Sequence, residues 1–246
     1  MTRHALLRVA FVGAAFLVLP GHAAAQELSL SLADGQSISA RSIQLIILVT
    51  VLSIAPGILM MITCFPFMVT VLSILRQGLG LQQAPPNMVM ISLALFLTYF
   101  VMEPVFQEAW RVGVNPLLEE RLELGPALTR SLEPFKVFMA ARLDSDTFYA
   151  IADLRPGTAG IDPDAEAPFS VLVPSFMLSE ISRAFQIGFL IFLPFMIIDM
   201  VVSAVLMSMG MMMVPPAVVS LPFKLAFFVV ADGWSMIAGA LVRSYT

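Results

Sequence analysis

The chain contains four long apolar segments, which run over residues 42–75, 87–102, 184–207 and 214–241. The first segment carries no charged residue and exceeds the roughly 20 apolar residues that a helix needs to cross a bilayer. A short turn joins the first two segments, and another joins the last two. The pattern therefore predicts an all-α integral membrane-type protein with two helical hairpins, at residues 42–102 and 184–246.

Proline residues interrupt these segments. Pro56-Gly57, Pro66 and Pro194 lie inside apolar stretches, and Glu103-Pro104 is predicted to end the second segment. Proline removes one backbone hydrogen bond from a helix and clashes with the preceding turn, so it bends or ends the helix. Such interruptions suit bent helical hairpins.

The two hairpins are separated by a polar insert, residues 103–183. Residues 106–173 hold 17 of the 30 charged residues of the chain, 11 acidic and 6 basic. Charges alternate with apolar residues at helical spacing over 115–125 and 131–154, and a turn-rich loop follows. We expect a small helical domain in water.

The N-terminus has the pattern of a secretory signal peptide over residues 1–25. Arg3 and Arg8 precede a short apolar core, and Ala23-Ala24-Ala25 forms a cleavage site. Residues 26–41 would then be a short periplasmic lead. Since two crossings return the chain to the same side, the insert is predicted to be periplasmic.

The two hairpin turns have related sequences. A shift of 130 residues places Gly80 on Gly210 and Pro85-Pro86 on Pro215-Pro216. Glycine permits a helix to end, and proline fits the first positions of the next helix, where no hydrogen bond is lost. The match indicates a duplicated hairpin.

Three consecutive methionines, Met211, Met212 and Met213, lie in the second turn. Three neighbours in sequence cannot share one face of a helix. One interpretation is interfacial filler, because the chain has 17 methionines. The other is a deformable gasket, since methionine is flexible and polarizable and a ring of such turns would seal a pore.

Charged residues are rare inside the apolar segments of the second hairpin, residues 184–207 and 214–241, where they are Asp199, Lys224 and Asp232. Asp199 and Lys224 lie at similar distances from the turn, so we expect them at similar depth and paired, within one chain or between subunits. Asp232 follows Lys224 by eight residues, which predicts two helical turns along the same face. A proton relay is the functional alternative.

Composition excludes several classes of protein. Hydrophobic residues make up 59% of the chain and charged residues 12%, whereas soluble domains have about 45–50% and about 25%. The single cysteine is Cys64, and the two histidines, His4 and His22, fall in the predicted signal peptide. We expect no catalytic residue, metal site, cofactor or nucleic-acid partner.

From Ile43 to the C-terminus, the chain resembles the FliP family of flagellar type III export-gate proteins. The resemblance is carried by seven runs: Ala84-Pro85-Pro86-Asn87, Ala94-Leu95-Phe96-Leu97-Thr98, Ala184-Phe185-Gln186-Ile187-Gly188-Phe189, Ile197-Ile198-Asp199, Gly210-Met211-Met212-Met213-Val214-Pro215-Pro216, Leu221-Pro222-Phe223-Lys224 and Asp232-Gly233-Trp234.

The resemblance implies an export gate in the inner membrane and flagellar basal body. Several copies, a pentamer in this family, would assemble with FliQ and FliR, and FlhB and FlhA would complete the apparatus. Unfolded flagellar subunits would pass through it. The resemblance also implies that Met211–Met213 form the gasket, and that bent hairpins are buried largely against other subunits.

Two departures from the family pattern limit what carries over. This chain has Cys64-Phe65-Pro66-Phe67 where the family has a run with a basic residue, and Met88 where it has glutamine. A small secondary transporter with broken helices is the alternative function. An intramembrane protease is a weaker rival, because no Ser-His pair or aspartyl motif is present.

Overall fold

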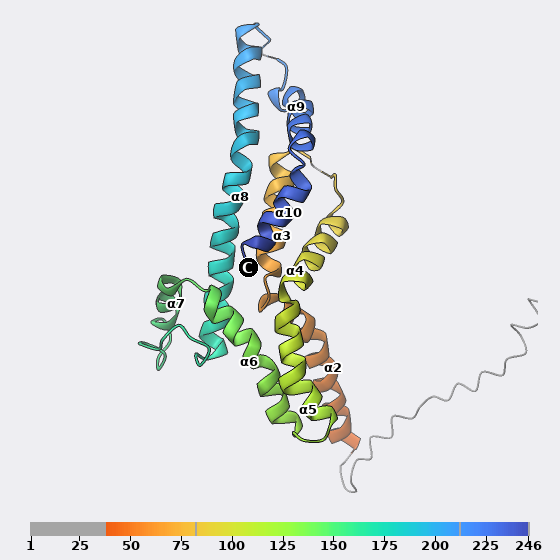
Figure 1. Cartoon of the computed structure of the whole chain (residues 1–246), viewed down its shortest axis with the longest axis vertical. Helices are drawn as coiled ribbons and strands as arrows, with labels where there is room; N and C mark the ends of the chain where they lie inside the picture. The colour runs from red at the N-terminus through yellow and green to blue at the C-terminus, as the bar shows by residue number, and fades with distance from the viewer. Residues whose placement is uncertain (1–37, 82, 212, 246) are drawn as a thin grey trace, which may run out of the picture. The chain divides into compact units, whose positions relative to one another are not determined.

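The computed structural model describes residues 38–81, 83–211 and 213–245, and every regular element in these ranges is helical (Figure 1). The predicted all-α class is confirmed. The signal peptide, most of the lead and Met212 lie outside the described residues. The helices are α2 (Ile38–Met61), α3 (Phe65–Gly78), α4 (Asn87–Ala109), the π-helical turn η1 (Trp110–Val114), α5 (Asn115–Leu118), α6 (Leu124–Arg142), α7 (Ser145–Ala152), α8 (Phe169–Ser208), α9 (Pro216–Val230) and α10 (Gly233–Arg243).

The chain divides into two compact units, residues 1–53 and residues 54–246. The described part of the first unit is the N-terminal portion of α2. Its side chains from residue 42 onward are exposed, although most are apolar.

The first apolar segment forms two helices, α2 and α3. Helix α2 continues through Pro56 and ends at Met61. Helix α3 starts at Phe65 and has Pro66 in its first turn, where proline loses no hydrogen bond. Pro66 therefore lies at the start of a new helix. Where the sequence suggests a bend within one helix, the structure has two separate helices, α2 and α3.

Helix α3 forms the centre of the second unit. Its side chains Phe67, Met68, Val71, Leu72 and Leu75 are buried. They pack chiefly against α8, which runs alongside α3 in Figure 1, and secondly against α4. An amphipathic helix buries its apolar face in this way, and this packing holds the two predicted hairpins together.

Two helix ends differ from the sequence-based expectations. Helix α4 does not end at Glu103-Pro104 but continues to Ala109, and the Glu103 carboxylate accepts a hydrogen bond from Gln107 Nε2 at 3.1 Å, one turn later. Helix α8 begins at Phe169, well before residue 184, and continues through Pro174 and Pro194. An interior proline removes one hydrogen bond, and neighbouring helices and local adjustments compensate in apolar surroundings.

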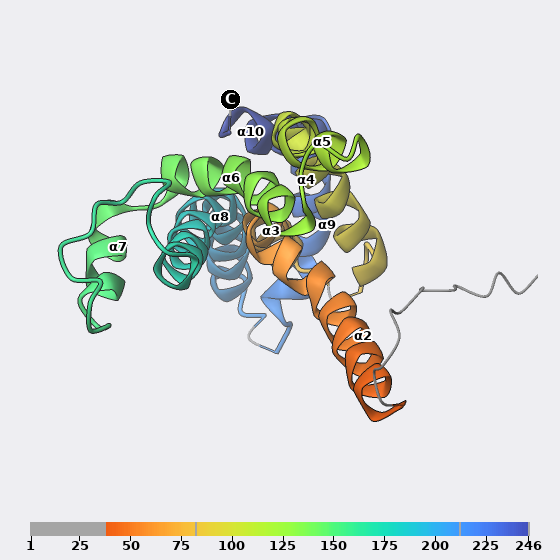
Figure 2. The same cartoon turned by 90° about the horizontal axis from the view of Figure 1, so that it is seen from below.

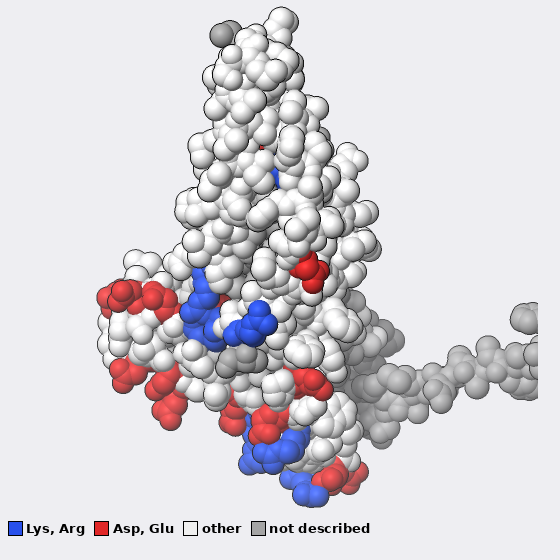
Figure 3. All heavy atoms as spheres, turned by 45° about the horizontal axis from the view of Figure 1, so that its top comes forward, with Lys and Arg blue, Asp and Glu red and all other residues white. Residues whose placement is uncertain are grey.

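The polar insert is helical, but its helices have other boundaries than the charge pattern predicts. Helix α5 has only four residues, and α6 begins at Leu124. Helix α6 packs against η1, α4 and α8, and α7 packs against α8 (Figure 2). Most charged side chains lie over this part of the second unit, whereas the surface along upper α8 and α9 is almost uncharged (Figure 3).

Among the residues that the structure describes, three helical segments are long and apolar enough to cross a membrane, namely Ser42–Met61, Asn87–Leu118 and Phe169–Ser208. A fourth crossing is formed if α9 and α10 act as one span, and these two helices are bent by 62° relative to each other. These assignments agree with an all-α membrane protein, and the bend between α9 and α10 lies at Asp232.

Candidate functional site

The helix ends before the two hairpin turns have the same hydrogen-bond pattern. After α3, the N–H of Gly80 donates to Gln77 O at 3.0 Å and that of Leu81 to Arg76 O at 3.4 Å. After α8, the residues 130 positions later repeat this pattern, with Gly210 N–H to Met207 O and Met211 N–H to Leu206 O, both at 3.0 Å. This pair of bonds is the Schellman motif, which satisfies the last carbonyls of a helix.

Each motif needs one residue in the left-handed region, and glycine fills it. The φ angles of Gly80 and Gly210 are +76° and +74°. Pro86 and Pro215 then adopt extended conformations immediately before α4 and α9. The two glycines therefore occupy equivalent positions. The prolines do not, because the shift of 130 residues pairs Pro86 with Pro216, and Pro86 precedes α4 whereas Pro216 is the first residue of α9.

The second turn exposes its methionines. Met213 is 97% exposed and Met211 is 39% exposed, while Met212 lies outside the described residues. Met211 also lines an apolar groove of about 560 Å3 between α8 and α9, together with Val201, Met209 and Phe223. The tip of the second hairpin therefore exposes apolar, flexible methionine side chains, those of Met211 and Met213.

The structure brings Asp199 and Lys224 together. Lys224 Nζ on α9 lies 2.6 Å from Asp199 Oδ2 on α8 and donates a second hydrogen bond to Gly78 O on α3 at 3.1 Å. Ser220 Oγ donates to the other carboxylate oxygen, Asp199 Oδ1, at 2.5 Å. The Lys224 side chain is 7% exposed and that of Asp199 is 37% exposed.

This pair joins three helices through one ammonium group. Both oxygens of Asp199 accept hydrogen bonds, and Lys224 reaches helices from both hairpins. A buried charge is tolerated when it is paired and its other hydrogen-bonding groups are satisfied. The arrangement suits a structural clamp, and a proton relay would require a next acceptor beyond it.

Asp232 lies apart from this pair. The prediction that it continues the Lys224 face by two turns is wrong, because α9 ends at Val230 and a new helix, α10, starts at Gly233. Asp232 is exposed at the bend and adopts a left-handed conformation with φ of 46°. Its carboxylate makes no capping hydrogen bond to α10.

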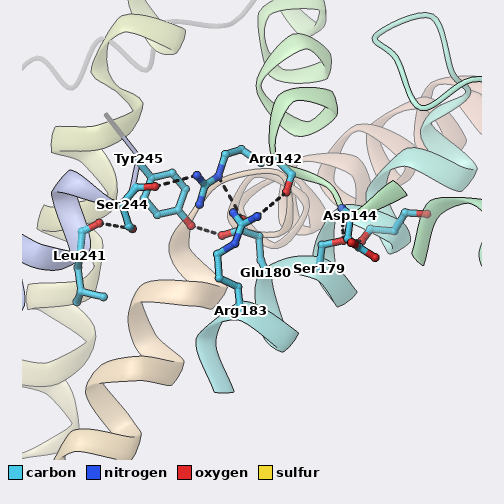
Figure 4. Close-up of polar contacts among 9 residues, drawn as sticks. Arg142, Asp144, Ser179, Glu180, Arg183, Leu241, Ser244 and Tyr245 are labelled. Atoms are coloured by element: carbon cyan, nitrogen blue, oxygen red, sulfur yellow. Dashed lines mark hydrogen bonds and ion pairs between the residues drawn. The ribbon is translucent and has the colours of Figure 1, made fainter. Parts of the chain in front are cut away.

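A second polar cluster, centred on Glu180 of α8, was missed by the sequence reasoning (Figure 4). The Glu180 side chain is fully buried. Its Oε1 lies 3.5 Å from Arg142 Nε and 3.4 Å from Arg183 Nη1, and its Oε2 accepts a hydrogen bond from the Tyr245 hydroxyl. Two guanidinium groups and one phenol thus surround one carboxylate, which we call the Glu180 cluster.

The Glu180 cluster anchors the end of the chain. Arg142 Nη1 donates to Ser244 O at 2.8 Å, and the Arg142 guanidinium lies 4.0 Å from the centre of the Tyr245 ring. Burial raises the pKa of the Tyr245 phenol, and the nearby Glu180 charge raises it further. The phenol therefore stays protonated and keeps donating to Glu180.

The same region fixes the start of α7. Ser179 Oγ accepts a hydrogen bond from Asp144 N–H at 2.9 Å, and the Asp144 carboxylate caps α7 by accepting from Thr147 N–H at 2.9 Å. This capping bond lowers the pKa of Asp144. The insert is thus tied to α8 beside the Glu180 cluster.

One sequence signal pointed to the Glu180 cluster. Helix α8 contains only three charged residues, and Glu180 and Arg183 are two of them, one helical turn apart. Because the apolar segment was taken to begin at residue 184, both fell in the predicted polar insert. Tyr245 and Arg142 carry no comparable signal.

Comparison with known proteins shows the family of the chain. The model of the FliP family matches residues 48–241. The flagellar biosynthetic protein FliP of Caulobacter vibrioides is 47% identical, over 99% of this chain and 91% of the relative. The proteins of the same name from Agrobacterium fabrum and Bacillus subtilis are 46% and 45% identical, over 98% and 87% of this chain and 100% and 96% of the relatives. The chain therefore belongs to the FliP family.

Proposed function

We propose that this protein is a component of the flagellar type III protein export gate, and that it forms with FliQ and FliR the channel for unfolded flagellar subunits. The observation that carries the proposal is the family match over residues 48–241. The relatives are named flagellar biosynthetic proteins, which supports a role in building the flagellum.

The apolar surface of the chain supports assembly with other subunits. Large apolar side chains are exposed along each long helix, for example Phe96 on α4, Phe189 on α8 and Val230 on α9. Surfaces of this kind require lipid or a protein partner. We propose a homo-oligomer, a pentamer by family resemblance, to which FlhB and FlhA are added.

We propose that Met211, Met212 and Met213 act as the gasket of the gate. Two observations support this role: the side chain of Met213 is exposed, and the backbone hydrogen bonds of Gly210 and Met211 hold the start of the turn. If each subunit contributes one such turn, the methionines form a ring of unbranched side chains that pack without fixed geometry. Such a ring blocks ions at rest and yields to a passing chain.

We propose that the protein resides in the inner membrane and flagellar basal body, with the α5–α7 insert in the periplasm. The charged surface of the insert supports contact with water. In this role the protein is structural, and its polar clusters hold helices together without carrying out catalysis.

A small secondary transporter is the second candidate function. The 62° bend between α9 and α10 favours it, because transporters bind substrates at broken helices. A transporter also needs convergent polar groups around a substrate, whereas the grooves beside α9 are lined by apolar residues.

Co-expression with FliQ and FliR, followed by mass measurement of the purified complex, separates these functions. An export gate gives a large complex that contains several copies of this chain and both partners. A transporter remains a small oligomer without them. Replacement of Met211–Met213 by alanine should then make the closed complex leak ions in liposomes, and an unchanged leak would contradict the gasket.

A further inference from the structure

A second apolar groove lies between α8, α9 and α10 and has a volume of about 390 Å3. We call it the α10 groove. All of its lining residues are apolar, and among them Phe195 and Ile237 are buried while Leu190 and Met236 are exposed. The groove therefore has a packed floor and open apolar walls.

Asp232 lies at the edge of the α10 groove. Both of its neighbours in sequence, Ala231 and Gly233, line the groove. Its carboxylate is exposed, does not cap α10 and forms no ion pair with any side chain that the structure describes. An unpaired carboxylate beside an apolar groove in a potential membrane span is unfavourable and usually marks a functional contact.

Asp232 is left-handed, a conformation that aspartate adopts more readily than most residues other than glycine, and it follows the end of α9. Gly233 packs directly against the Phe228 ring, so the glycine of this bend is used for close packing. The backbone N–H of Asp232 donates to Val229 O at 3.1 Å and its carbonyl accepts from Met236 N–H at 3.0 Å, so only its carboxylate has no contact that explains it in the described residues.

We infer that the α10 groove binds an apolar helix of a different protein chain, and that this helix carries one Lys or Arg whose charge pairs with Asp232. The small residues Ala231 and Ala240 permit the close approach that packing in a membrane requires. The inference rests on the proposed function in one respect, that the chain works within a membrane assembly of several proteins.

A second copy of this chain does not supply the matching charge from the part that the structure describes. On the apolar helices, Arg76 bonds Asn87, and Lys224 bonds Asp199. Arg183 contacts Glu180. Arg243 on α10 also has an interaction of its own. Since each cation of the apolar helices whose side chain the structure describes has a partner, the inference assigns the complementary cation to another protein.

The test places a photo-crosslinking amino acid, benzoylphenylalanine, at Met236 of the full chain in its membrane complex. Mass spectrometry of the product should identify an apolar segment with a Lys or Arg within about two helical turns of the crosslink. A crosslink to a second copy of this chain, to lipid alone, or to a segment without a basic residue would overturn the inference, as would no crosslink.

Variants at Asp232 test the charge. Asp232→Asn keeps a residue that tolerates the left-handed conformation, and it should reduce the crosslink about tenfold, the effect of losing one favourable contact. Asp232→Gly should do the same, while Asp232→Glu retains part of the yield. Asp153→Asn, at an exposed aspartate after α7, is the control and should have no effect.

An unchanged crosslink yield in Asp232→Asn would mean that the charge of Asp232 does not contribute to binding, and it would overturn the inference. The mass of the wild-type complex, measured on the same samples, distinguishes a failure of the proposed function from a failure of the inference about the α10 groove. Absence of the large complex counts against the proposed function, whereas an intact complex with an unoccupied groove counts against the α10 groove alone.

Discussion

Lys224 Nζ lies 2.6 Å from Asp199 Oδ2, and the two partners differ in their access to solvent. The Lys224 side chain is 7% exposed and the Asp199 side chain 37%. Loss of Asp199 leaves a buried ammonium, whereas loss of Lys224 leaves a partly exposed carboxylate. The two single variants should therefore differ in stability.

We expect Asp199→Ala to destabilise the protein more than Lys224→Met. The first variant leaves a buried ammonium with only Gly78 O, and removing one partner of a buried pair costs about 3–5 kcal/mol. The second leaves a carboxylate that retains Ser220 and partial solvent contact. Unfolding in detergent by SDS titration measures both.

The double variants of this pair supply the control. Asp199→Ala with Lys224→Met should be less destabilised than the sum of the single variants, because neither charge is left alone. Reversal of the two charges should restore assembly only in part, since a carboxylate at position 224 cannot donate to Gly78 O. Additive effects and no recovery on reversal would contradict the pairing.

Tyr245→Phe removes the hydroxyl that donates to the buried Glu180. We expect a loss of about 1–3 kcal/mol in the free energy of unfolding, because a buried acceptor loses its partner. Tyr149→Phe is the control, since Tyr149 is partly exposed and has no hydrogen bond through its hydroxyl in the described residues. Equal effects of the two changes would contradict this role.

The same tyrosine predicts a dependence on alkaline pH. Burial raises the pKa of Tyr245 above its ordinary value of 10.0, so the folded phenol keeps its proton where the unfolded one loses it. Deprotonation then stabilises only the unfolded state, and stability should fall as the pH rises above about 10. In Tyr245→Phe this part of the alkaline loss should disappear, as measured by unfolding at pH 9 to 11.

Gly113 in η1 lies against the backbone of α6. A Cβ at this position would come 2.7 Å from Ala127 O and 2.8 Å from Ser131 N, and backbone atoms cannot move aside. Gly113→Ala should destabilise the protein by about 1–3 kcal/mol through overpacking. Gly125→Ala in α6 has open space and should be neutral or stabilising, so thermal unfolding of the two variants should shift in different directions.

Glu120 has a φ of 56° in the turn between α5 and α6. Glycine adopts this conformation without a steric penalty, so Glu120→Gly should stabilise the protein by up to about 1 kcal/mol. Glu133→Gly, inside α6, should instead cost about 1 kcal/mol. A loss of stability in both variants would contradict the assigned backbone strain.

Cys64 should be unreactive in the folded protein. Its side chain is buried, and burial raises the pKa of its thiol to about 12, so little thiolate forms near neutral pH. A maleimide should label it only after unfolding. Met213→Cys adds a cysteine at an exposed position and should be labelled at once, and rapid labelling of wild type would contradict the burial.

Sequence reasoning succeeded where the relevant distances lie within one hairpin. Asp199 and Lys224 were placed at similar depth because each lies a similar number of residues from the turn, and the structure puts them in contact. Gly80 and Gly210 were matched by spacing, and their turns share hydrogen bonds. Local geometry and a single turn suffice for both inferences.

The rest depends on contacts between distant parts of the chain. The Glu180 cluster joins α6, α8 and the C-terminus, and 65 residues separate Glu180 from Tyr245. No periodic pattern reports such a contact. Likewise, Glu103-Pro104 looks like a helix end by local preference, but packing of α4 against α3 and α6 keeps the helix intact beyond it.

The length of α8 sets a distance between the two polar clusters. Its 40 residues correspond to about 60 Å, roughly twice the hydrocarbon thickness of a bilayer. Glu180 and Asp199 are separated along it by roughly 28 Å, close to that thickness. A single helix therefore sets the spacing between the buried Glu180 and the partly exposed Asp199, and a shift of α8 along its own axis would displace both together.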